Sequence, residues 1–289
     1  MATLVELVGD DEASKLTALS KGVKRLEEDC DFIVPDTGFV TNNLLRPSYD
    51  HEIGKVMPRY MTRYDTSPFS LIKFYKELSN PRKRDLDEIN LDEIHDRFDQ
   101  SLFISDTVLD KLTSLLLEGK IAAPSKANEE LAISHTTCLK KTIIFEDIFR
   151  KIMANGYTSK MIEENRNEAY NLAECRKAFF REQYRSYVKD LIKNTKACLG
   201  KLDMFIGLIR ARNCIVEDSG MFTDSDKRII DGAMELDGRV GIASCDSHFY
   251  EKTGEVIKLR KSSGLKVPNV TLMFAMRDLR GYNILRFKY

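Results

Sequence analysis

A regular spacing of basic residues in the middle of the chain constrains its fold more than any other feature. Every fourth position is basic in the series Lys177, Arg181, Arg185, Lys189 and Lys193. In a helix, like charges four residues apart repel each other by roughly 0.2–0.5 kcal/mol per pair. This basic ladder therefore needs an anionic counterpart, either within the protein or in a partner.

The residues around the basic ladder predict a long helix over 159–212, with a possible interruption at Gly200 or Gly207. Apolar residues follow two parallel stripes in its second part. One stripe contains Phe180, Tyr184, Tyr187, Leu191 and Cys198, and the other contains Val188, Ile192, Leu199, Leu202, Ile206 and Ile209. A two-stranded coiled coil needs a single narrow seam. Two stripes instead indicate the broad buried face of a core helix.

The formal net charge of zero hides an asymmetry along the 289 residues. Residues 1–150 contain seven more acidic than basic residues, and residues 151–289 show the reverse. This split favours either an anionic partner for the basic half or docking of the two halves on each other. The acidic run at 85–99 is interpreted either as a solvated acidic face or as a docking face for the basic ladder. We therefore divide the chain into an acidic helical region, 1–150, and a basic region, 151–289.

The sequence of the acidic region predicts mostly helices. We expect a helix over 10–29 and a loop-like stretch over 31–60, which contains three prolines and two glycines. Further helices are expected over 67–79, 90–99, 105–118 and 137–155. Two short strand-like pieces, 120–122 and 131–134, follow the third of these helices.

The order of three helices and a hairpin makes 67–135 a possible winged-helix-like subdomain. An ordinary helical subdomain with an exposed loop is the alternative. The expected third helix carries Asp106, Asp110 and Glu118 but only one lysine, Lys111. Such a helix suits DNA phosphates poorly. A winged helix at this place is therefore expected to bind a protein and not DNA.

The end of the chain changes character. Thr223 is expected to cap a short helix that ends near Leu236. Four β-prone runs follow at 238–244, 254–260, 269–276 and 282–289, separated by turn residues. The fold predicted is mainly α: a multi-helix globular body with a small C-terminal β element over 238–289, α+β overall.

Signatures of catalysis are mostly missing from the sequence. It contains no phosphate-binding P-loop, no glycine-rich dinucleotide fingerprint and no nucleophile elbow. Cys245 and His248, with Cys214, form only a weak zinc pattern. Pro35-Asp36 could begin a nuclease site, but such a site needs carboxylates on adjacent strands and this region shows little strand signal. We therefore expect no catalytic residue, no metal and no cofactor, and leave open whether the chain is an enzyme.

The geometry of the basic ladder suggests nucleic acid as its ligand. Four helical residues rise by about 6 Å, which is close to the phosphate spacing of an extended single strand. Aromatic side chains between the charges could stack on bases. The candidate residues for binding RNA or a single strand are Lys177, Arg181, Arg185, Lys189, Lys193, Tyr184 and Tyr187.

The candidate binding residues also allow other functional interpretations. Tyr184 and Tyr187 also belong to an apolar stripe, so they can face the core. The first alternative is a structural or assembly subunit whose acidic and basic halves mediate protein–protein docking, either with a partner protein or in a homo-oligomer. The second is a metal-dependent nuclease or phosphohydrolase. Scattered cysteines, the lack of a secretory signal and the lack of a long apolar stretch favour an intracellular protein, cytoplasmic or nuclear, without a membrane partner.

Overall fold

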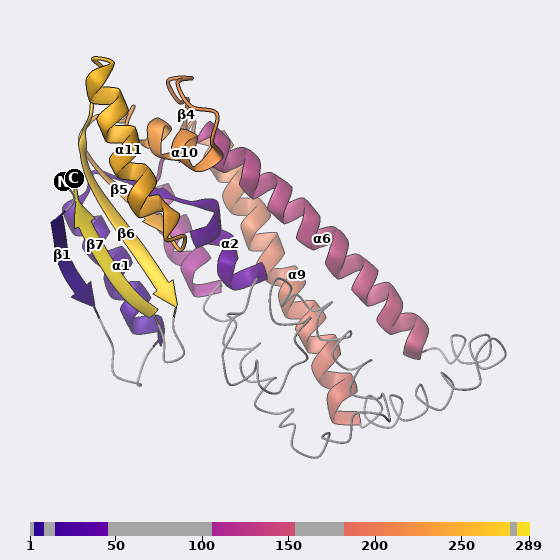
Figure 1. Cartoon of the computed structure of the whole chain (residues 1–289). Coiled ribbons are helices and arrows are strands. Elements are labelled where there is room, and N and C mark those ends of the chain that lie inside the picture. Colours follow the sequence, from indigo (N-terminus) through magenta and orange to yellow (C-terminus); the bar gives the residue numbers. More distant parts are fainter. Residues whose placement is uncertain (1–2, 9–14, 46–105, 154–181, 278–281) are drawn as a thin grey trace, which may run out of the picture. The chain divides into compact units, whose positions relative to one another are not determined.

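The computed structural model describes residues 3–8, 15–45, 106–153, 182–277 and 282–289 (Figure 1). The chain divides into two compact units that interleave along the sequence. Unit 1 comprises Met1–Asn43, Ile104–Ser134 and Lys201–Tyr289, and unit 2 comprises Leu44–Phe103 and His135–Gly200. The expected boundary at residue 150 does not coincide with this division, because unit 1 draws on both halves of the chain.

Unit 1 is built on a five-stranded mixed sheet. From one edge to the other, the strands are β1 (Thr3–Val8), β7 (Tyr282–Lys288), β6 (Asn269–Arg277), β5 (Arg239–Ser244) and β2 (Phe32–Pro35). Strands β2, β5 and β6 are parallel, whereas β7 runs antiparallel to both β6 and β1. The carboxyl ends of β2, β5 and β6 therefore lie at the same edge of the sheet.

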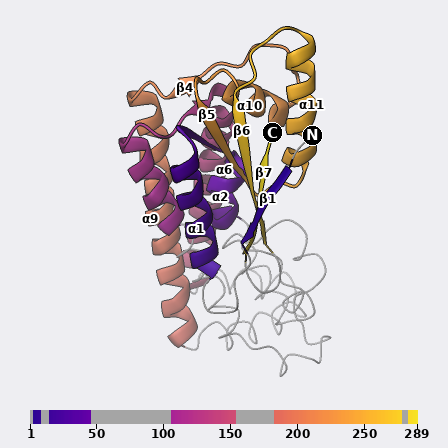
Figure 2. The same ribbon diagram turned by 90° about the vertical axis from the view of Figure 1, so that its left-hand side faces the viewer.

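Helices cover both faces of this sheet, as Figure 2 shows for α1 (Lys15–Asp29) and α11 (His248–Ser262). Helix α1 approaches its face closely because β5 carries a glycine there. A methyl group on Gly241 would lie 3.1 Å from Leu26 and 3.0 Å from the Cys30 sulfur. Glycine at this position thus permits tight helix–sheet packing.

A hydrophobic core cluster lies on the opposite face, beneath α11 and α10 (Ser225–Ala233). Every second residue of β2, β5 and β6 contributes its side chain to this core, because successive side chains of a strand point to opposite faces of the sheet. The buried members are Val34, Val240, Ile242, Val270 and Leu272 from the sheet, with Ile229, Ile230, Phe249 and Val256 from the helices.

A second, two-stranded parallel sheet pairs β3 (Ala123–Pro124) with β4 (Ile215–Val216). Just before β3, the Ile33 amide of β2 donates to the Lys120 carbonyl, and the Ala122 amide donates to the Ile33 carbonyl. These bonds cover the outer edge of β2. Pairing of an exposed sheet edge with other chains is a common hazard, and this edge is protected from it.

Two long helices run from one unit into the other: α6 (Ser125–Met153) and α9 (Glu182–Ala211). From Leu191 onward, where the burial of α9 is described, both predicted apolar stripes are buried. The buried residues include Leu191, Ile192, Cys198, Leu199, Leu202, Ile206 and Ile209. The prediction of a broad buried face is confirmed for this part of the helix, and residues 159–181 of the predicted helix lie outside the described residues.

Three local predictions are wrong. Part of the expected loop forms β2 and α2 (Thr37–Leu45), and the strand-like runs 131–134 and 254–260 are helical, in α6 and α11. In α11 the buried residues Phe249, Thr253, Val256 and Arg260 follow helical spacing. Burial of that face outweighs the β-preference of Val256 and Ile257. The hairpin needed for a winged helix is therefore absent at 131–134.

Other predictions hold. Helices are present at residues 106–117 and in α1. Helix α10 is also present, but the prediction of Thr223 as its cap is wrong, because Asp224 is the N-cap and the helix begins one residue later. The described residues are helix-rich with a mixed sheet, in agreement with an α+β fold. However, the sheet is not a C-terminal element alone, because β1 and β2 come from the N-terminus. Within the described part of the chain, no helix is long and apolar enough to cross a membrane.

Candidate functional site

The basic ladder is described only at its C-terminal end. Lys189 and Lys193 are exposed on α9. Arg185, Tyr184 and Tyr187 belong to the same helix, but their side chains lie outside the described set, as do Lys177 and Arg181 altogether. Among described residues, no ion pair involves Lys189 or Lys193. These two ammonium groups therefore remain candidates for contact with an anionic ligand.

Basic residues beyond the ladder do pair with the acidic half of the chain. Lys201 Nζ lies 2.7 Å from Asp106 and 3.0 Å from Asp110, and Lys196 Nζ lies 2.5 Å from Glu146. The hydrogen bond to Asp106 is the main reason why the pKa of Lys201 is raised. The positive charges just C-terminal to the basic ladder are therefore balanced by carboxylates of the acidic half of the chain. The acidic run 85–99 lies outside the described residues.

The most unusual ionisable group in the described structure is Asp36, directly after β2. It is 5% exposed, although carboxylates are rarely buried without a cationic partner. Its position follows from the sheet register: Pro35 of β2 pairs with Ala243 of β5, so Asp36 and Ser244 meet at the carboxyl edge. The Asp36 amide extends the hydrogen bonding between β2 and β5 by donating to the Ala243 carbonyl at 2.8 Å.

Two donors serve the Asp36 carboxylate. Ser244 Oγ donates to Oδ2 at 3.0 Å, and the Gly38 amide donates to the same oxygen at 3.2 Å. These bonds only partly offset the loss of hydration. Burial is the main reason why the pKa of Asp36 is raised to about 7, and the negative charges of Asp226 and Glu130 add to the rise.

Asp36, Glu130 and Asp226 form what we call the carboxylate cluster. They come from three elements: Asp36 follows β2, Glu130 lies in α6, and Asp226 lies in the first turn of α10. Asp246 stands beside the cluster, because its amide donates to Ser244 Oγ at 3.0 Å. The edge formed by β2 and β5 therefore concentrates negative charge around one buried carboxylate.

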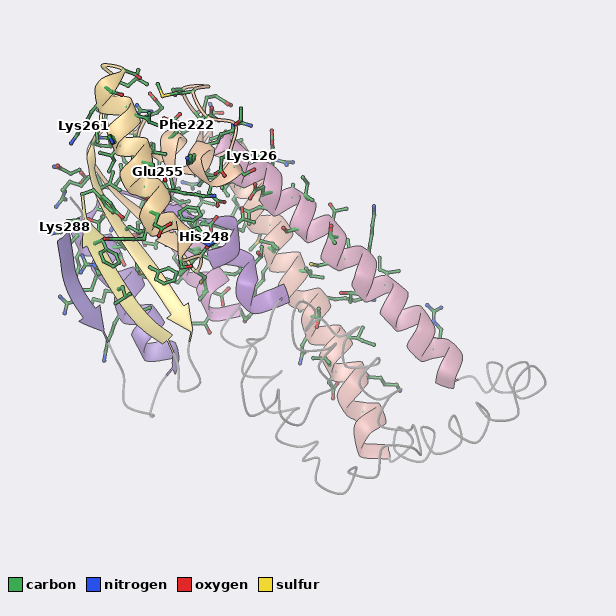
Figure 3. All side chains as sticks on the ribbon, viewed as in Figure 1. Lys126, Phe222, His248, Glu255, Lys261 and Lys288 are labelled. Atoms are coloured by element: carbon green, nitrogen blue, oxygen red, sulfur yellow. The ribbon has the colours of Figure 1, made fainter. Side chains whose placement is uncertain are left out.

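A lysine of α11 pairs with one member of this cluster. Lys252 Nζ lies 2.6 Å from Asp226 and 3.0 Å from each carboxylate oxygen of Asp224. Burial lowers the pKa of Lys252, but its hydrogen bonds to Asp226 and Asp224 outweigh that effect and the pKa is raised. At the start of α11, the exposed His248 ring lies 3.7 Å from Asp246 (Figure 3).

The carboxylate cluster is not a ready-made metal cage. In the part of the chain that the structure describes, no group of three or more histidine, cysteine or carboxylate residues stands close enough to hold a metal ion. Cys245 and His248 accordingly do not form the zinc site considered from the sequence. Magnesium, however, commonly binds through one or two carboxylates and keeps several water molecules.

The sequence suggested Asp36 only as a weak start of a nuclease site, because the strand β2 before it and its pairing with β5 were not predicted. Hydrogen bonding between Asp36 and Ser244 joins residues that are 208 positions apart. A usable signal was nevertheless present: Phe32–Pro35 is a short apolar run that is followed directly by Asp36, and 239–244 is a similar run followed by Asp246. In parallel sheets, ligands bind outside the carboxyl ends of the strands.

Comparisons with known proteins give no match. No protein-family model matches the chain, and neither a curated protein nor a solved structure does. The functional inference is therefore drawn from this chain's own residues.

Proposed function

We propose that this chain hydrolyses phosphodiester bonds of nucleic acid, with a divalent cation bound at the carboxylate cluster. The observation that carries the proposal is Asp36, a carboxyl that is 5% exposed at the carboxyl edge of the sheet. Burial raises its pKa to about 7, and the negative charges of Asp226 and Glu130 add to the rise. Strongly perturbed groups of this kind gather at functional sites. A divalent cation is the natural complement, because its charge would offset both the burial of Asp36 and the repulsion among the carboxylates.

Such a cation would supply charge stabilisation at a phosphate and lower the pKa of an attacking water. The carboxylates of Asp36 and Asp226 would hold and orient it. Because hard cations such as Mg²⁺ and Mn²⁺ prefer oxygen ligands, they are the ions to test. Nucleic acid is the proposed substrate because Lys189 and Lys193 are exposed on the helix whose basic spacing matches an extended strand.

A cleavage assay tests this function. End-labelled RNA and single-stranded DNA are incubated with the full chain in Mg²⁺ or Mn²⁺, and in parallel with a chelator. We expect metal-dependent cleavage that Asp36→Asn abolishes. Asp31→Asn is the matched control, because Asp31 adjoins the other end of β2 but is exposed and paired with Arg239. Absence of cleavage in both ions by the folded wild-type chain would refute the proposal.

A second candidate is nucleic-acid binding without catalysis, through the basic ladder. The exposure of Lys189 and Lys193 favours it. It predicts binding to a labelled single strand that weakens steeply with salt, and loss of that binding on charge reversal at Arg181, Arg185 and Lys189. Binding without cleavage would select this candidate over hydrolysis.

The same experiments bear on an assembly role. A chain that neither cleaves nor binds nucleic acid, but forms a defined oligomer or copurifies with one protein partner, would support the structural subunit proposed as an alternative. A partnerless monomer that binds RNA would oppose it.

A further inference from the structure

Helix α11 has two flanks that differ in their chemistry. On the flank towards α10, Lys252 and Glu255 form ion pairs with residues of α10 and its cap. Eleven helical residues make about three turns, so Tyr250 and Lys261 share the other flank. This second flank adjoins β7, because the ring centroids of Tyr250 and Phe287 lie 4.5 Å apart.

Three aromatic rings, those of Tyr250, Phe287 and Tyr289, form what we call the aromatic platform. The Tyr289 ring centroid lies 6.3 Å from that of Tyr250, and the Tyr289 hydroxyl donates to the Tyr250 carbonyl at 2.8 Å. Phe287 and Tyr289 pack against the hydrophobic core cluster and stay partly exposed, whereas Tyr250 is 40% exposed. Tilted contacts of this kind are favourable between aromatic rings. The Tyr250 ring is therefore held by its neighbours and still presents surface to solvent.

Lysines of α11 place positive charge beside the aromatic platform. Lys258 and Lys261 are exposed, and no ion pair between described residues involves either of them; Figure 3 shows Lys261 toward the end of the helix. They follow Tyr250 by about 12 and 16.5 Å along the helix axis. The exposed carboxylate of Glu251 lies about 100° round the helix from Tyr250. The flank beside β7 therefore combines an exposed aromatic ring with two ammonium groups.

We propose that this flank of α11 binds a single strand of nucleic acid, with one base stacked on Tyr250 and phosphates at Lys258 and Lys261. The inference rests on the proposed function for the class of its ligand and adds where the strand is held. Proteins that bind single strands combine positive charge along the backbone with aromatic side chains under the bases. Because every base has a π-face, the site should show little sequence preference. A purely apolar partner would gain nothing from the two ammonium groups.

The test measures binding rather than cleavage. A labelled oligouridine is titrated with the full chain in the presence of a chelator, and binding is followed by fluorescence anisotropy. Tyr250→Ala should raise the Kd by about 5- to 150-fold, which is the range for the loss of one stacked base. Tyr250→Phe keeps the ring and should bind like the wild-type chain. An abasic strand of the same length should bind equally to the wild-type chain and Tyr250→Ala, since it has no base to stack.

Control variants separate stacking from charge and from structure. Leu259→Ala should leave the Kd unchanged, because Leu259 is 44% exposed on α11 but lies about half a turn round the helix from Tyr250. Lys258→Gln with Lys261→Gln should reduce the slope of log Kd against log salt by about 1.4, the value for two phosphate contacts on a single strand. Circular dichroism establishes which variants are folded. If Tyr250→Ala does not fold, Tyr250→Leu removes the ring and keeps an apolar side chain.

The outcomes are distinguishable. A Kd that rises in Tyr250→Ala for the oligouridine, but not for the abasic strand and not in Leu259→Ala, supports the inference. An unchanged Kd in Tyr250→Ala, or an equal rise for both strands, overturns it and leaves the proposed function to the cleavage assay. Absence of binding by the wild-type chain at low salt also overturns it. If the expected binding pattern is found without cleavage in Mg²⁺ or Mn²⁺, hydrolysis is refuted and the binding site stands.

Discussion

Replacing Asp36 by asparagine should stabilise the fold at alkaline pH, although it removes a residue proposed to be functional. The pKa of Asp36 rises from 3.8 to about 7 in the folded chain, chiefly through burial. One pKa unit corresponds to about 1.4 kcal/mol. Ionised Asp36 therefore costs the folded state about 4 kcal/mol relative to an exposed carboxylate.

The sign of the pH dependence follows from proton binding. Between the unfolded value of 3.8 and the folded value of about 7, the folded chain holds the Asp36 proton and the unfolded chain does not. Wild-type stability from this group therefore falls as the pH rises through that window, and levels off above it. Asparagine does not titrate. The advantage of Asp36→Asn should consequently grow by about 2–3 kcal/mol between about pH 5 and pH 8.

Hydrogen bonding adds a contribution that is independent of pH. Asparagine keeps one acceptor for Ser244 or Gly38 but introduces an amide donor, at a cost of about 1 kcal/mol if that donor stays unpaired. The diagnostic quantity is therefore the difference between the two pH values, measured by urea denaturation without divalent cations. Asp31→Asn should show no such change, because pairing with Arg239 lowers the pKa of Asp31. The stability that ionised Asp31 contributes is lost only as the pH falls through its lowered pKa, which lies below the pH range of this measurement. An Asp36→Asn advantage that is the same at both pH values would refute the reasoning.

Three further variants, one of them a double substitution, have expected results. Arg260→Met should lower the free energy of unfolding in urea by about 3–5 kcal/mol. Arg260 is 1% exposed, and its replacement removes the cation that pairs with the fully buried Asp231, which keeps only its hydrogen bonds from Ser219. A loss below about 1 kcal/mol would contradict this. Leu26→Ala should cost about 2–5 kcal/mol by the same assay, because it opens a cavity under α1, and an unchanged midpoint would oppose that packing. Lys189→Glu with Lys193→Glu should weaken binding to single-stranded RNA and reduce its salt dependence. Lys140→Glu, an exposed lysine of α6, should not.

The sequence by itself determined the elements whose own residues decide their conformation. The two apolar stripes of α9 are sufficient to predict a broad buried face, because helical spacing brings them together without help from the rest of the chain. The same holds for α1 and α10, where spacing or a capping residue marks the helix. The strands β5, β6 and β7 were also recognisable from their β-branched and aromatic residues.

Only the tertiary structure decided how these elements combine. The run 254–260 prefers a strand locally, yet burial of Val256 and Arg260 against the core makes it helical. Nothing in the sequence near Asp36 indicates that β2 pairs with a strand more than 200 residues away. Strand pairing depends on contacts between distant segments, whereas helix formation depends on neighbours. For that reason the basic ladder was visible from the sequence, and the carboxylate cluster at the sheet edge was not.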